Sequence, residues 1–352
     1  MDRKNRLQEL DALRGLAAFG VLLFHFTLNQ NGKKLGWQFG YGVTGVDIFF
    51  MISGFVIFLT IHKIKKWQEF VVFRFARLYP TYWACMLLTT IFILIYNPDT
   101  FDPLQFLANL TMISTLLNKE VLDGSYWTLL VELQFYLWIL ILYIPKGIKY
   151  TAQIGFFFTI SIVLFHYFEI YYHDFYWITL KRVPLLSHFP LFFSGILFYN
   201  LKFKTFSLND VVLILVCLAA SLYLHDKGGR AMYATTALEH QSILVFYHIV
   251  FALFVLDKLH FIVKPSLLFL GKISYSLYLL HQYIGVQLIS TFTETLHLNI
   301  YFALILTIII CIGLAYLVTT YLELPAIRYF RSRYKNREQS RFEKHTPEAL
   351  KP

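Results

Sequence analysis

The chain has 352 residues, of which 57% are hydrophobic and only 15% are charged, and its formal net charge is +10 at pH 7. This composition excludes an ordinary soluble domain, because too few polar residues remain to cover its surface. Apolar windows of about 20 residues, long enough to cross about 30 Å of bilayer hydrocarbon, recur nearly end to end. We therefore predict an all-α integral membrane protein.

Ten apolar windows predict a bundle of about ten transmembrane helices, which form one domain over residues 1–327 and precede a basic tail over residues 328–352. The predicted spans are Leu10–Leu28, Val43–Ile61, Leu78–Tyr96, Tyr126–Ile144, Ile154–Tyr172, Val183–Leu201, Leu208–Leu224, Ala237–Leu256, Leu267–Ile289 and Leu298–Leu322. The segment Phe101–Leu117 is also apolar, but Asp102, Pro103 and Asn109 interrupt it. We expect an interfacial or re-entrant helix there.

The distribution of Lys and Arg predicts the orientation, because cytoplasmic loops are enriched in these residues. With the N-terminus inside, the inner segments carry 23 of the 31 basic residues. Both termini are then cytoplasmic in a multi-pass protein of the inner (cytoplasmic) membrane. Topology and anionic membrane lipid explain the positive charge, so nucleic-acid binding is not expected.

Ionisable residues inside predicted spans are costly in hydrocarbon and usually mark a site or a pathway. Arg14 and His25 lie in the first span and Asp47 in the second. Counting by depth, we expect His25, Asp47, Glu132 and His281 in an outer layer. A second, inner layer holds Arg14, Arg74, Arg77, Asp11 and Glu323. Cys85, Cys217 and Cys311 have no paired spacing, and we expect packing thiols and no metal site.

Helical geometry relates Arg14 to His25. Eleven residues at 100° each end about 20° past three full turns, so both side chains project from one face, about 16.5 Å apart along the axis. A cytoplasmic ligand with phosphates near the arginines and a long thin arm would reach the histidine, as a coenzyme A thioester does. Arg74 and Arg77 share a face at i, i+3, which suits a phosphate cluster.

Six segments resemble the acyltransferase-3 family of membrane acyltransferases, in order along nearly the whole chain. They are Leu10–Ala18 followed by His25, Gly45–Phe55, Arg74–Pro80, Tyr126–Glu132, Ile273–His281 and Glu323–Pro325. The resemblance implies transfer of an acyl group, most often acetyl, from cytoplasmic acyl-CoA to a hydroxyl of a cell-surface or lipid-linked glycan in the bacterial cell envelope. The SGNH hydrolase-like domain that many relatives carry is not expected here, so the membrane domain would act alone or with a separate partner.

The expected roles combine this resemblance with the chemistry of the side chains. His25 is the predicted base or nucleophile, and Asp47 would orient it if the two are close. Arg14, Arg74 and Arg77 would hold acetyl-CoA, although Arg14 could instead pair with Asp11 or Glu323, and basic residues beside a span can be topology signals. The substrate-binding or supporting residues are Trp127, Glu132, His281 and Glu323, of which the two glutamates would bind acceptor hydroxyls, tune His25 or pair with basic neighbours. Trp127 would stack on a sugar or belong to an interfacial belt, and His166, His188, His240 and His248 are taken as structural.

Several alternatives stay open at this point. A transporter or channel would also need buried charges, and an N-acyl or succinyl transferase would use a similar donor. A covalent acyl-histidine, direct transfer and a homo-oligomer are each compatible with the sequence.

Overall fold

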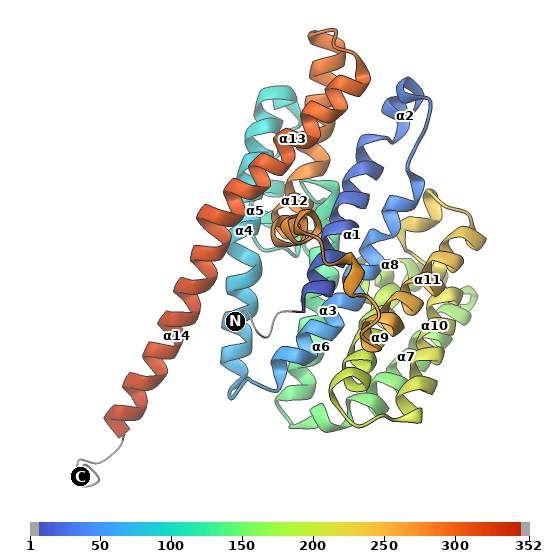
Figure 1. Cartoon of the computed structure of the whole chain (residues 1–352), viewed down its shortest axis with the longest axis vertical. Helices are drawn as coiled ribbons and strands as arrows, with labels where there is room; N and C mark the ends of the chain where they lie inside the picture. Colours follow the sequence, from blue (N-terminus) through green and yellow to red (C-terminus); the bar gives the residue numbers. More distant parts are fainter. Residues whose placement is uncertain (1–6, 346–352) are drawn as a thin grey trace.

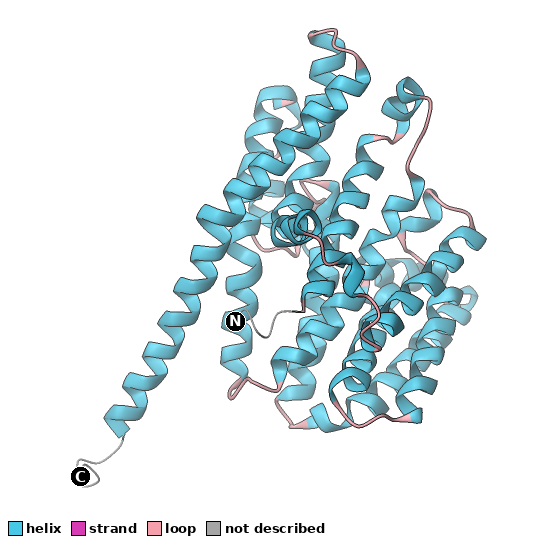
Figure 2. Ribbon diagram, viewed as in Figure 1, coloured by secondary structure: helices cyan, strands magenta, loops and turns pink. Residues whose placement is uncertain are grey.

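The computed structural model describes residues 7–345, with side chains through residue 339, and within that range every regular element is helical (Figure 2). The prediction of an all-α protein is confirmed. Arg3, Lys4 and Arg6, counted above as inner charges, and residues 346–352 of the basic tail lie outside the described residues.

Ten long helices overlie the ten predicted spans in order (Figure 1). They are α1 (Gln8–Phe26), α3 (Gly45–Ile61), α4 (Trp67–Tyr96), α6 (Trp127–Tyr143), α7 (Thr151–Tyr167), α9 (Leu185–Phe203), α10 (Leu208–Tyr223), α11 (Ala237–Val255), α12 (Pro265–Ser290) and α13 (Ile300–Val318). Within residues 7–345, seven helices are long and apolar enough to cross a membrane, or nine if two bent pairs count as spans. The chain is a multi-pass membrane protein.

Two features explain why this count of seven to nine spans is lower than the ten predicted. In each bent pair a sharp bend joins two helices, 85° between α1 and α2 (Asn29–Leu35) and 53° between α8 (His173–Arg182) and α9. Helix α12 is missing from both counts, because Lys272, His281 and several tyrosines make it less apolar than its neighbours. Its middle is nevertheless buried among other helices, which cover His281, Tyr275 and Tyr278 but leave Lys272 exposed.

The interrupted segment Phe101–Leu117 does not span. It contains α5 (Pro103–Asn109) and a short helical turn at Ser114–Leu117. Seven residues rise only about 10.5 Å, a third of the hydrocarbon thickness. Asp102 caps α5 by accepting a hydrogen bond from the Leu104 N–H at 2.8 Å.

The basic tail begins as a long helix. A π-helical turn at Thr319–Glu323 joins α13 to α14 (Leu324–His345), which runs along α4 and extends past the bundle (Figure 1). The rings of Phe75 and Phe330 meet with centroids 5.5 Å apart. Residues predicted as a tail therefore return to the domain and cover one side of it.

Glycines allow two pairs of helices to approach closely. A Cβ added to Gly271 of α12 would lie 2.0 Å from the carbonyl oxygen of Asp11 in α1. A Cβ added to Gly195 of α9 would lie 2.0 Å from the carbonyl oxygen of Met51 in α3. Small residues permit such backbone contact between membrane helices. The first pair carries His25 and His281, and the second carries Asp47 and His188.

Candidate active site

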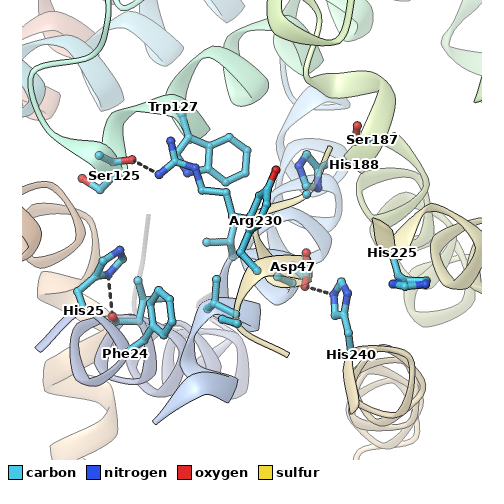
Figure 3. Close-up of a pocket in the computed structure, with 18 of the residues that line it drawn as sticks. Phe24, His25, Asp47, Ser125, Trp127, Ser187, His188, His225, Arg230 and His240 are labelled. Carbon is cyan, nitrogen blue, oxygen red and sulfur yellow. Dashed lines mark hydrogen bonds and ion pairs between the residues drawn. The ribbon is translucent and has the colours of Figure 1, made fainter. Parts of the chain in front are cut away.

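A cavity of about 470 Å³ opens between α1, α3, α6, α9 and α11 at the bundle end where α1 finishes (Figure 3). We call it the histidine cavity, because His25, His188, His225 and His240 line it, with Asp47. Its volume lies within the range of small-molecule sites. It thus has room for a ligand such as one or two sugar rings.

His25 contacts His281 at one side of this cavity. The Nδ1 atom of His281 lies 2.8 Å from the carbonyl oxygen of Tyr278. A carbonyl oxygen only accepts, so Nδ1 carries the proton of the neutral His281 ring and Nε2 accepts. That Nε2 atom lies 3.0 Å from Nδ1 of His25, which also lies 3.0 Å from the Val21 carbonyl oxygen. In neutral His25 the proton therefore sits on Nδ1, and Nε2 keeps a free lone pair.

The contact confirms the depth predicted for His281, beside His25. Asp47 lines the same cavity, but its carboxylate receives a hydrogen bond from His240 Nε2 at 3.0 Å (Figure 3). In this structure it is His281, and not Asp47, that contacts the His25 ring. Asp47 thus faces the same space from the opposite wall.

Two histidines taken as structural from the sequence belong to this opposite wall. His188 and His240 are each 5% exposed and line the cavity. Nε2 of His188 and Nδ1 of His240 are buried without a hydrogen-bond partner in the described protein. No local pattern marks them, because His240 lies 193 residues from Asp47. His166 and His248 fit the structural interpretation, since Tyr176 and Ser194 respectively bond to them.

Trp127 also lines the histidine cavity, with Arg230 beside it. The Arg230 guanidinium lies 5.3 Å from the centroid of the indole ring and donates to the Gly124 carbonyl oxygen at 3.1 Å. Arg230 belongs to the loop between α10 and α11, where burial lowers its pKa from the ordinary value. Its position in a loop outside every predicted span gives no sign in the sequence of this place beside the cavity.

A second, narrower cavity of about 110 Å³ lies towards the opposite end of the bundle. We call it the arginine cavity, because Arg14, Arg74 and Arg77 line it. Arg14 and His25 thus line two successive cavities from the single helix α1, where their spacing predicted one shared lining. Arg331 of α14 lies close enough for its charge to interact with Arg74 and Arg77.

The ion pair at this end joins Arg77 to Glu323. Glu323 is 1% exposed and also accepts from Ser276 at 3.0 Å. Arg74 donates to Thr60 at 3.0 Å, and its Nε atom is buried without a partner among the described residues. Glu323 therefore holds Arg77, whereas Arg74 keeps a free donor in the cavity wall.

The predicted depth of Glu132 was wrong. Glu132 lines the arginine cavity and accepts hydrogen bonds from Ser53 at 3.2 Å and from Tyr136. It lies five residues after Trp127, and a rise of about 7.5 Å along α6 carries it past the histidine cavity. Its carboxylate instead partly offsets the positive charge of the arginines.

Tyr278 and Val46 line both cavities. The Tyr278 hydroxyl lies 3.1 Å from that of Thr128, and its ring meets Phe49 edge to face. These side chains form the partition between the two cavities. Any group that passes from one cavity to the other must move the Tyr278 side chain or pass beside it.

Comparisons with known proteins show which proteins the chain is similar to. The family model described as "Acyltransferase domain" matches residues 7–317. The "Putative acetyltransferase ORF330" of Acidianus two-tailed virus is 23% identical over 283 residues, 79% of this chain and 83% of that protein. No solved structure matches the chain significantly.

Two further relatives match a shorter part. The peptidoglycan O-acetyltransferase OatA of Listeria monocytogenes is 27% identical over 150 residues, which are 36% of this chain and 22% of that protein. The O-acetyltransferase OatA of Staphylococcus aureus is 33% identical over 152 residues, 37% of this chain and 24% of that protein. In both cases the match covers less than a quarter of the relative.

Proposed function

The chain belongs to the acyltransferase family whose domain model covers residues 7–317, and we propose that it is a membrane O-acetyltransferase with a glycan or lipid-linked saccharide as acceptor. Acetyl-CoA is the proposed donor. The observation that carries the proposal is the pair of successive cavities along α1, one rich in arginine and one presenting a free histidine nitrogen.

The arginine cavity would hold the donor. Guanidinium groups bind phosphates through charge-assisted hydrogen bonds, and Arg74 has an unpartnered donor there. Arg14, Arg77 and Arg331 add positive charge around it. The narrow cavity suits the thin arm of a thioester, which would point past Tyr278 towards His25.

His25 would act as a general base. Its free Nε2 takes the proton of an acceptor hydroxyl as the hydroxyl oxygen attacks the thioester carbonyl carbon. The carbon–sulfur bond breaks, the acetyl group forms an ester with the acceptor, and the thiolate takes up the proton. His281 keeps the His25 proton on Nδ1 throughout.

In this proposal the arginine cavity faces the cytoplasm, as the distribution of basic residues favours. The acceptor then enters the histidine cavity from the outer side, and both termini are cytoplasmic.

Reconstituted protein tests the proposal with acetyl-CoA labelled in the acetyl group. Wild type is expected to release thiol and to acetylate a saccharide acceptor, and His25→Ala to lose this turnover while binding CoA with unchanged affinity. Solute flux without thioester turnover would refute the enzyme and favour a transporter.

A further inference from the structure

Arg230 is a cation at the histidine cavity without an acidic partner. It donates to the backbone oxygen of Gly124, and no carboxylate of the described residues forms an ion pair with it. Loss of solvent lowers its pKa, so the surrounding groups do not fully compensate for its charge. A negatively charged ligand bound in the histidine cavity would supply the acidic partner that the Arg230 guanidinium does not have.

The two buried acids nearest this region are already engaged. Asp123 accepts from the N–H and hydroxyl of Ser125, both at 2.7 Å, and from the Tyr283 N–H at 2.8 Å. Asp47 accepts from His240. Neither carboxylate pairs with Arg230, so the guanidinium keeps donors for a ligand.

The place of Arg230 suits recognition of the acceptor. Figure 3 shows its side chain in the middle of the cavity view, between His25 on one side and Asp47 with His240 on the other. The Trp127 ring supports the guanidinium at 5.3 Å. Contact with an aromatic face fixes a guanidinium without neutralising it.

The opposite wall offers further hydrogen-bonding partners for hydroxyls. The unpartnered Nδ1 of His240 carries a lone pair in the neutral ring, because Nε2 donates to Asp47. The unpartnered Nε2 of His188 is also buried there. A buried polar atom without a partner is costly, and a ligand hydroxyl would relieve that cost.

We infer that the acceptor is an acidic saccharide, whose carboxylate binds Arg230 while a neighbouring hydroxyl reaches His25 Nε2. Further hydroxyls of the same sugar bind His188 and His240. This inference rests on the proposed function, because it assigns the acceptor to the histidine cavity.

Equilibrium binding of two probes to the purified, reconstituted protein tests the inference. Methyl glucuronide carries a carboxylate at C6 where methyl glucoside carries a hydroxymethyl group, and calorimetry measures the Kd of each. Wild type is expected to bind the glucuronide about tenfold more tightly or better, as one charge-assisted contact provides. Arg230→Gln is expected to bring the ratio of the two Kd values close to one.

Arg182→Gln is the matched control, because Arg182 is an exposed arginine outside the cavity, at the end of α8. It should retain the preference for the glucuronide. Equal Kd values in wild type, no binding of either probe, or a preference that survives Arg230→Gln would overturn the inference.

Thioester turnover is measured separately on the same samples. If wild type showed no thioester turnover, or if His25→Ala turned over as fast as wild type, the proposed function would be refuted. Normal turnover without a preference for the glucuronide would refute only the acidic acceptor.

Discussion

Replacing His281 with Ala is expected to slow acyl transfer about five- to tenfold without changing the KM for acetyl-CoA. The substitution removes the 3.0 Å contact that holds the Nδ1 proton of His25. One such hydrogen bond contributes about 1–1.5 kcal/mol, which corresponds to that factor. The loss stays moderate because the Val21 carbonyl oxygen, also 3.0 Å away, still accepts the proton. His281→Gln should recover most of the rate, since its amide oxygen can accept in place of Nε2.

The assay is acetyl transfer from labelled acetyl-CoA by the protein in lipid nanodiscs, with kcat and KM measured for each variant. His166→Ala is the matched control, because His166 is as buried as His281, at 1% exposure, but lies outside both cavities. It should lose stability without a specific loss of kcat. If His281→Ala were as inactive as His25→Ala, or fully active, the assigned role in holding the proton would be refuted.

Three other substitutions probe the remaining parts of the site. Tyr278→Ala is expected to join the two cavities and to raise acetyl-CoA hydrolysis relative to transfer, measured as thiol release without acceptor; an unchanged ratio would contradict the partition. Arg74→Gln should raise the KM for acetyl-CoA about tenfold with little change in kcat, because a charged donor is lost; an unchanged KM would exclude donor contact. Gly271→Ala should destabilise the protein by about 1–3 kcal/mol, because its Cβ would lie 2.0 Å from the Asp11 oxygen. Gly313→Ala, where nothing lies within 4 Å, is its control in thermal unfolding; equal melting temperatures for the two variants would contradict close packing at Gly271.

The sequence predicts well whatever depends on one helix. Arg14 and His25 share α1, so the rise and twist of a helix determine their separation and face without knowledge of any neighbour. The same argument placed His281 correctly, because its depth follows from its position along α12. Apolar length likewise located the ten helices that overlie the predicted spans, but not the polar α14.

Prediction failed where depth or proximity depends on several elements. Glu132 was assigned to the wrong layer because the start of α6 relative to α1 is a property of the packed bundle. His188 and His240 meet the site through α9 and α11, and Arg331 returns to it only because α13 continues into α14 through a π-helical turn. Such approaches leave no periodic pattern in the sequence.

Helices α1 and α12 contact each other through glycines near one end and through histidines near the other. Gly15 packs against Gly271, and ten residues later in both helices His25 contacts His281, so α1 and α12 run parallel and in the same register. The two contacts lie about 15 Å apart along the axes. A slip of one turn would displace the histidines by about 5.4 Å and break their contact. Close packing of Gly15 against Gly271 therefore determines the register of α1 and α12, and the contact between His25 and His281 depends on that register. Tyr278, one turn before His281, is held between the cavities by the same register.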